Sequence, residues 1–225
     1  MSVRRVLIPL ALALVVARCS DSGHPATGPV SGPAPHMLHW ADAASLKFNA
    51  VGGDPAGGST EGMFASLTGG ISLDRNTATF WAVRGEARSV TINYLSSTGD
   101  TSFPFLTLTI TDPVFVPGRG DLAAGDSVLV TVTIDPNDIK VSLEPTGMLF
   151  GDPAQLRMSY GGAGGDLNGD GAVDAIDAEI ENQLLGLWYR EGAESTWSRI
   201  PAAQVVSDKT FISALLHFSE YAVSW

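Results

Sequence analysis

The chain has 225 residues and a formal net charge of −11, from 13 basic and 24 acidic side chains. We do not expect so acidic a chain to bind nucleic acid, because contact with backbone phosphates needs clustered lysine and arginine. The single cysteine, Cys19, excludes a disulfide within the chain, so the fold has to rest on its hydrophobic core.

The first 18 residues have the pattern of a secretory signal peptide. Arg4 and Arg5 precede an apolar run, Val6–Ala17, that is too short to span a bilayer comfortably and has the length of a signal-peptide core. Cys19 follows at once, which resembles the lipidation site of bacterial lipoproteins. The resemblance implies cleavage before Cys19, acylation of that cysteine and an exported chain anchored by lipid in the bacterial cell envelope, in the periplasm or on the outer surface. An ordinary signal peptide or an uncleaved anchor is the alternative.

Cleavage before Cys19 would remove three arginines and no acid, leaving 10 basic and 24 acidic residues and a net charge of −14. This charge gives no attraction to anionic lipid, so membrane attachment is expected to come from acyl chains on Cys19. Residues 19–40, rich in proline, glycine and small polar residues, predict a flexible linker behind the cysteine. Residues 41–70 carry a weak signal, and we expect a poorly defined, loop-rich lead-in there.

Alternation of apolar and polar residues begins near Ile71 and continues through most of the remaining chain. In the clearest run, Val128, Val130, Val132 and Ile134 alternate with Leu129, Thr131 and Thr133. Other strands are expected at Ala78–Ala82, Val90–Tyr94, Leu106–Ile110, Ile139–Leu143, Leu156–Tyr160, Leu187–Arg190, Trp197–Ile200 and Thr210–Phe218. Short strands with one apolar face, separated by turns, predict an all-β fold over residues 71–225, an antiparallel β-sandwich.

The stretch from Asp166 to Asp177 is where residue type and spacing together predict a metal site. Side-chain oxygens stand at positions 1, 3, 5, 9 and 12 of this run, as calcium-binding loops require. The expected calcium ligands are Asp166, Asn168, Asp170, Asp174 and Asp177, with the backbone carbonyl of Ala172. Gly171 permits a sharp turn, and Val173 is expected to point into apolar packing. An ion-free surface turn is the alternative.

This pattern resembles the calcium loop of dockerin repeats, a relative of the EF-hand, and the resemblance implies a structural calcium ion. Dockerin loops lack an entering helix, and here the glycine-rich stretch Gly161–Gly165 cannot form a stable one. Ile176, Ile180 and Leu184 recur every fourth residue and predict one short helix after the loop, running to about Leu185 with Gly186 as its stop. The sequence holds no second repeat of this kind.

A second resemblance lies in Leu143–Leu156, which matches the pattern L-x-P-x-G-x-x-F-x-x-P-x-x-L. This is similar to the core of the β-sandwich first described in zonula occludens proteins and the Unc-five netrin receptors, the ZU-five domain. Leu187–Glu191, the strand at Trp197 and the closing His217–Val223 follow in the expected order. The resemblance implies a non-catalytic interaction or scaffold module with the calcium-type loop inserted between two late strands.

We expect no catalytic residues. The sequence has no His-Glu-x-x-His zinc helix and no Gly-x-Ser-x-Gly elbow, and His217 is expected to be a structural hydrogen-bonding residue at a strand end. Four tryptophans are expected to fill the core or its rim rather than to stack on sugars. They are Trp81, Trp188, Trp197 and Trp225.

These observations favour a monomeric, lipid-anchored β-sandwich that carries structural calcium and binds an unknown protein or glycan partner. A calcium-dependent carbohydrate-binding module is one alternative, and exposed coplanar tryptophans would support it. A secreted hydrolase is another, and a cleft with two acids outside Asp166–Asp177 would support that.

Overall fold

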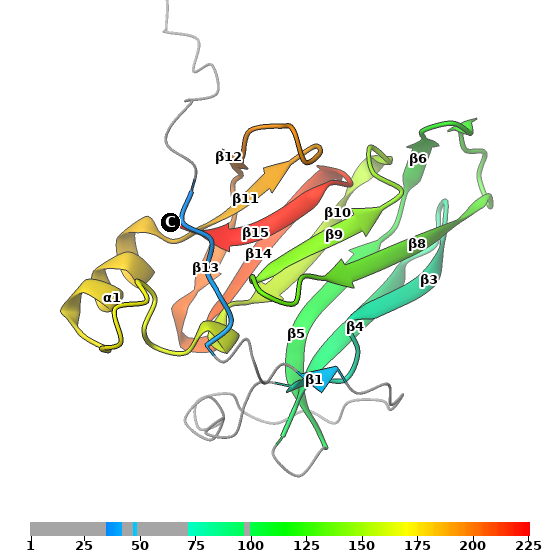
Figure 1. Ribbon diagram of the computed structural model, residues 1–225. Helices are drawn as coiled ribbons and strands as arrows, with labels where there is room; N and C mark the ends of the chain where they lie inside the picture. The colour runs from blue at the N-terminus through cyan, green and yellow to red at the C-terminus, as the bar shows by residue number, and fades with distance from the viewer. Residues whose placement is uncertain (1–34, 42–46, 49–71, 97–99) are drawn as a thin grey trace, which may run out of the picture. The chain divides into compact units, whose positions relative to one another are not determined.

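The computed structural model describes residues 35–41, 47–48, 72–96 and 100–225 (Figure 1). The expected signal peptide of residues 1–18, the expected lipidation site Cys19 and most of residues 41–70 lie outside the described residues. No helix in the described part of the chain is both long enough and apolar enough to cross a membrane.

The described residues form two β-sheets, in which every strand pair is antiparallel except β1 with β2. The larger sheet contains β1 (Lys47–Phe48), β2 (Ser72–Leu73), β4 (Arg88–Leu95), β5 (Thr101–Ile110), β6 (Pro113–Val116), β7 (Gly120–Asp121), β10 (Leu149–Ser159), β13 (Ala203–Val205) and β14 (Thr210–His217). The smaller sheet contains, in spatial order, β12 (Ser198–Arg199), β11 (Gly186–Arg190), β15 (Glu220–Ser224), β9 (Lys140–Glu144), β8 (Ser127–Ile134) and β3 (Thr77–Val83). The expected all-β sandwich is confirmed.

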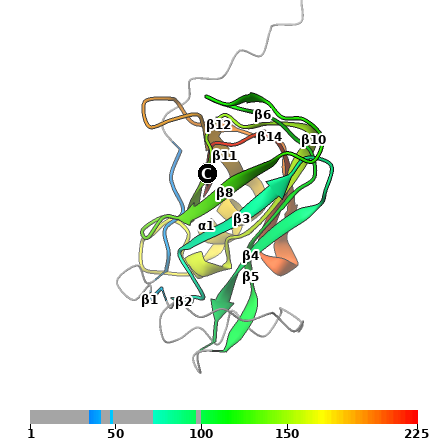
Figure 2. The same ribbon diagram turned by 90° about the vertical axis from the view of Figure 1, so that its right-hand side faces the viewer.

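The two sheets pack on one shared hydrophobic core (Figures 1 and 2). On β8 the alternation holds, because Val130 and Val132 are fully buried whereas Leu129 faces solvent. From β5 in the other sheet, Leu106 and Leu108 join the same buried cluster. Burial of each such aliphatic side chain contributes about 1.5–3 kcal/mol, so the alternation itself supplies much of what stabilises this sandwich.

A segment near the start of the described chain, His36–Ala41, is part of the sandwich, and we call it the strap. The Leu38 amide donates to the carbonyl of Val223 in β15 (3.0 Å), and the Ile139 amide donates to the Leu38 carbonyl (2.8 Å). The strap therefore lies between β15 and the turn that precedes β9. Leu38 and Trp40 are buried. The linker expected over residues 19–40 thus overlaps the sandwich at residues 36–40, because these two apolar side chains find places in the core.

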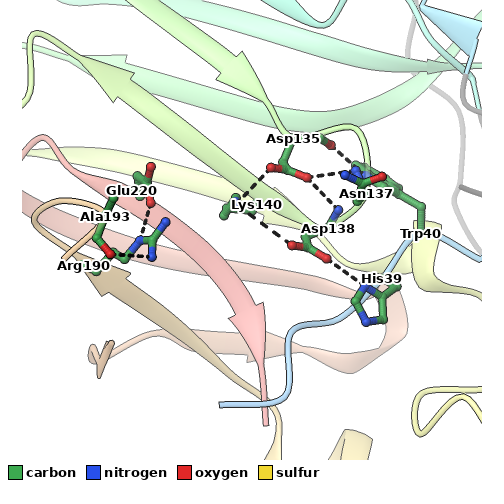
Figure 3. A network of polar contacts seen from close by, with 9 residues as sticks. All are labelled: His39, Trp40, Asp135, Asn137, Asp138, Lys140, Arg190, Ala193 and Glu220. Atoms are coloured by element: carbon green, nitrogen blue, oxygen red, sulfur yellow. Dashed lines mark hydrogen bonds and ion pairs between the residues drawn. The ribbon is translucent and has the colours of Figure 1, made fainter. Parts of the chain in front are cut away.

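Polar contacts fix the strap to the β8–β9 turn (Figure 3). His39 Nδ1 lies 2.7 Å from Asp138 Oδ1, and the Trp40 indole N–H donates to the Asp135 carbonyl (3.0 Å). Burial alone would raise the pKa of Asp135, but hydrogen bonds from Lys140 and from two amides of the same turn outweigh burial and lower that pKa. Asp135 is therefore a firmly ionised anchor at neutral pH.

Some strands lacked a readable signal. β6 and β7 form a small hairpin in a stretch where only the turn between them, Pro117–Gly120, was expected. β10 begins at Leu149 rather than near Gln155, because its pairing with β14 shifts register between Leu149 and Ala154 and the side-chain alternation is lost there.

Candidate metal centre

The stretch expected to bind calcium leaves the larger sheet after β10 and rejoins the smaller sheet at β11. A short turn, Gly161–Ala163, leads into it. Gly169 and Gly171 inside it have φ angles of 75° and 88°. A residue with a Cβ atom rarely adopts such angles, so this backbone path needs glycine at both positions.

The expected short helix follows the loop. It consists of α1 (Ala175–Glu179) and a wider, π-helical turn, Ile180–Leu184. The helix ends as expected near Leu185, but Gly186 is not a free helix stop, because it already belongs to β11.

The first expected ligand, Asp166, is turned toward amides of its own loop. Its Oδ1 accepts hydrogen bonds from the amides of Gly169 (2.8 Å) and Asp170 (3.1 Å), and its Oδ2 accepts one from Gly171 (2.8 Å). The carboxylate thus fixes the bend that the two glycines make possible.

The last expected ligand, Asp177, joins the two ends of the loop. Its Oδ2 accepts from the Asp174 amide (2.9 Å), and its Oδ1 accepts from the amides of Leu167 (2.7 Å) and Asn168 (3.2 Å). The Asp174 amide first, and then those of Leu167 and Asn168, lower the pKa of Asp177 against the opposing effect of desolvation. The loop therefore closes on an ionised carboxylate that is only 3% exposed.

The ligands expected in the middle of the loop form hydrogen bonds with neighbouring residues of the same loop. Asn168 Nδ2 donates to Asp170 Oδ2 (2.9 Å), and Asp170 Oδ1 accepts from the Ala172 amide (2.9 Å). Asp174 accepts from the Ile176 amide (2.8 Å) and, with Asp177, forms a capping box at the start of α1. The side-chain oxygens thus fold onto the backbone amides along the whole loop.

A hard cation such as calcium takes six to eight oxygen ligands. Among the residues that the structure describes, no three His, Cys, Asp or Glu side chains are grouped so as to hold a metal ion. The expected calcium ligands also include the Asn168 amide oxygen and the Ala172 carbonyl, and carboxylate oxygens keep lone pairs beyond those that the amides use. The donor chemistry fits calcium, and calcium binding here stays a prediction.

The apolar residues around the loop are less buried than expected. Val173 is 72% exposed instead of packed into the body, because it lies against the bare backbone of Gly165 at the surface. Of the expected helical stripe, only Ile180 reaches the core, whereas Ile176 and Leu184 are 54% and 45% exposed. The π-helical turn accounts for Leu184: its extra residue per turn, closed by the bond from the Leu185 amide to the Ile180 carbonyl (2.9 Å), brings Leu185 into the core in its place.

The hairpin of β13 and β14 holds together the two ends of the segment between β10 and β11. Gln204 in β13 donates from Nε2 to the Tyr160 hydroxyl (3.0 Å) and to the Glu181 carbonyl (2.8 Å). Lys209, in the turn before β14, donates to Glu181 Oε1 (2.6 Å), and its carbonyl accepts from the Tyr160 amide (2.7 Å). No sequence signal could have found this cluster, because its members lie far apart in the chain and each is common at surfaces.

A hollow of about 340 Å³ separates the strap from the start of the loop. Its wall includes His36, whose ring stacks on Trp225 with centroids 4.5 Å apart. Among the described residues that line it, Asp166 is the only acid. This described lining therefore holds no pair of carboxylates, outside Asp166–Asp177, of the kind that would have supported a hydrolase.

The described tryptophans lie singly, and Trp81 is the exposed one among them. Among the described residues no two tryptophan rings are in contact: Trp188 donates its indole N–H to a backbone carbonyl (3.1 Å), and Trp197 lies 4.9 Å from the Arg190 guanidinium. Trp81 is 59% exposed, opposite Leu129 on β8, and so differs from the core or rim position expected for it.

His217 lies at the end of β14, and its contacts are with neighbouring strands. Its ring meets Tyr189 edge-on at 5.3 Å, and its carbonyl accepts a hydrogen bond from the Tyr221 hydroxyl (2.6 Å).

The two segments that resemble the ZU-five pattern lie side by side. The Gly147 amide donates to the Phe218 carbonyl and the Phe218 amide to the Met148 carbonyl, both at 2.9 Å. The rings of Phe150 and Phe218 pack edge to face at 5.1 Å. No family model matches the chain, and neither a curated protein nor a solved structure matches it. The ZU-five and dockerin resemblances therefore stay predictions.

Proposed function

We propose that this protein is a non-catalytic β-sandwich module of the bacterial cell envelope, anchored by lipid on Cys19, that carries a structural calcium ion and serves in binding or scaffolding. The observation that carries the calcium part is the closure of the loop on itself: Asp177 accepts amides from both of its ends, Leu167 and Asp174. This closure joins the first and last expected ligand positions, so calcium binding would need only the side chains between them to turn inward.

Calcium would be held by side-chain oxygens of Asp166, Asn168, Asp170, Asp174 and Asp177 and by the Ala172 carbonyl. Bound there, the ion would offset two of the four negative charges on these carboxylates and so weaken their mutual repulsion. Gln204 already fixes the ends of the loop through Tyr160 and Glu181. Less chain therefore has to be ordered when the ion binds, which favours affinity.

Calcium titration with thermal unfolding tests this part. A dissociation constant of ~10⁻⁴ M at ~1 mM calcium would raise the free energy of unfolding by about 1.4 kcal/mol. Asp166→Ala should abolish the rise, whereas Asp121→Ala, an exposed acid in β7, should keep it. If the wild type shows neither binding heat nor a thermal shift, the loop is an ion-free turn.

The anchor is tested separately. The sequence leads from a lipoprotein-type start through a proline-rich linker into the strap at His36. We expect the wild-type chain to incorporate labelled fatty acid and to sediment with membranes, and Cys19→Ala to do neither. A Cys19→Ala chain that stays in the membrane fraction would point to an uncleaved apolar anchor instead.

A further inference from the structure

β3 is an open edge of the smaller sheet. It lies at the border of that sheet and pairs on one side with β8, over its whole length (Figure 1). β3 has 7 residues, whereas the other border strands in the described chain, β1, β7, β12 and β13, have 2, 2, 2 and 3. Short border strands offer little to pair with, so β3 is the edge that could accept another strand.

The hydrogen bonds at its two ends show which residues of β3 face β8. The Ile134 amide donates to the Asn76 carbonyl (2.8 Å), and the Arg84 amide donates to the Asp126 carbonyl (2.9 Å). Both belong to the same register as the β3–β8 pairing. Because bonded and non-bonded pairs alternate in an antiparallel ladder, the even-numbered residues of β3 bond to β8.

The odd-numbered residues Thr77, Thr79 and Trp81 consequently point their N–H and C=O groups away from β8. In the part of the chain that the structure describes, these groups make no hydrogen bond. All three side chains are exposed. A row of unpaired backbone donors and acceptors thus runs along an accessible border.

The border also lacks the features that normally prevent pairing. Thr77–Val83 contains no charged residue, no proline and no bulge in its pairing with β8. Trp81 and its cross-strand neighbour Leu129 are 59% and 47% exposed and form an apolar pair beside the edge. Such an edge is a template for another strand.

We propose that this edge pairs with the same edge of a second copy of the chain, antiparallel and about a two-fold axis, so that two smaller sheets become one continuous sheet. In a two-fold arrangement the odd-numbered row meets itself, so donors face acceptors along the shared edge. An uncharged row can meet itself without opposing like charges, although each whole chain carries a charge of −11. This inference goes beyond the proposed function and replaces the expected monomer by a dimer.

Sedimentation of the full chain carrying Cys19→Ser, over a range of protein and salt concentrations, tests the proposal. We expect the dimer fraction to rise with protein concentration. It should also rise with salt, since the screening length falls from about 10 Å at 0.1 M to about 3 Å at 1 M and weakens the repulsion between two acidic bodies. All variants are built in this same chain, so association through the N-terminal apolar run would be common to all of them.

Two substitutions of Thr79 separate edge pairing from other contacts. Thr79→Pro removes an N–H that faces the open side and leaves the bonds to β8 intact, and it should abolish the dimer. Thr79→Lys should do the same by placing a charge on the edge. Thr133→Lys is the matched control, with the same change in charge on the same face of the neighbouring strand β8, and it should keep the dimer.

Amide hydrogen exchange at Thr77, Thr79 and Trp81 supplies an independent readout, and it should slow in the dimer and not in Thr79→Lys. If Thr79→Pro fails to fold, Thr79→Lys and the exchange data decide. A wild type that is monomeric at every concentration and salt overturns the proposal. So does a dimer that persists in folded Thr79→Lys.

Discussion

The side-chain amide of Gln204 lies 3.0 Å from the hydroxyl of Tyr160. The same nitrogen donates to the Glu181 carbonyl at 2.8 Å. One residue of β13 thus joins Tyr160 and Glu181, the two ends of the segment between β10 and β11, which we call the neck of the loop. Burial, which outweighs the opposing hydrogen bond from Gln204, raises the pKa of Tyr160. The hydroxyl therefore stays neutral and remains an acceptor for Gln204 over the physiological range of pH.

Gln204→Ala should lower the free energy of unfolding by about 1–2 kcal/mol, because two hydrogen bonds are lost and the hydroxyl of the buried Tyr160 is left without this partner. Urea unfolding in the presence of chelator measures the effect without metal. Gln183→Ala, on the exposed side of the helix after the loop, is the control and should change stability by less than about 0.5 kcal/mol. Equal effects of the two substitutions would show that the neck contact does not stabilise the fold.

Gly162→Ala should loosen the strap. A Cβ atom at this position would lie 2.5 Å from a ring carbon of Trp40 and 3.0 Å from the Tyr94 hydroxyl. Such overpacking costs about 1–3 kcal/mol, and hydrogen exchange at the Leu38 and Ala41 amides should become faster. At Gly192 a Cβ meets nothing within 4 Å, so Gly192→Ala serves as control and should match the wild type. Unchanged exchange in Gly162→Ala would contradict the tight Trp40 contact.

Asp177→Asn should destabilise the protein in a manner that depends on pH. The pKa of Asp177 is lowered in the fold, so its stabilisation is present above the unfolded value of about 3.9 and is lost as pH falls through the lower folded value. The difference in unfolding free energy between wild type and variant, measured with chelator, should be constant near neutral pH and should shrink below about pH 4. A difference that stays constant into that acidic range would show that the amide contacts do not favour the ionised form.

Asp74→Ala should be among the more damaging substitutions in the larger sheet. Asp74 is fully buried and accepts from the amide and side chain of Asn93, both at 3.2 Å, and from Arg75 at 3.3 Å. Asn93 Oδ1 and Arg75 Nε already lack partners, so removal of the carboxylate adds to an unsatisfied buried group. We expect a loss of about 3 kcal/mol in urea unfolding. Asp152→Ala, at an exposed position of β10 in the same sheet, should cost much less.

The sequence by itself determined the fold class and most of the strands. Alternation such as that of Val128–Ile134 fixes which face of a strand is apolar, and an apolar face has to be covered by another layer. It also located the short helix that begins at Ala175, because Ile176 and Ile180 repeat at helical spacing. It likewise required glycine where the loop bends at Gly171, whose φ is positive in the structure. These are local properties, and local chemistry is enough to specify them.

Only the tertiary structure decided where segments meet. Leu38 and Trp40 are buried in the sandwich because the strap lies between β15 and the turn before β9. No local sequence pattern encodes that arrangement. That Gln204 closes the neck of the loop depends on strands brought together from distant parts of the chain. The β3 edge is open because of the order of the strands in the sheet. The sequence around Thr79 is equally compatible with a strand at the centre of a sheet. The physical reason is common to all three: burial and pairing are properties of neighbours in space, whereas a sequence pattern records neighbours along the chain.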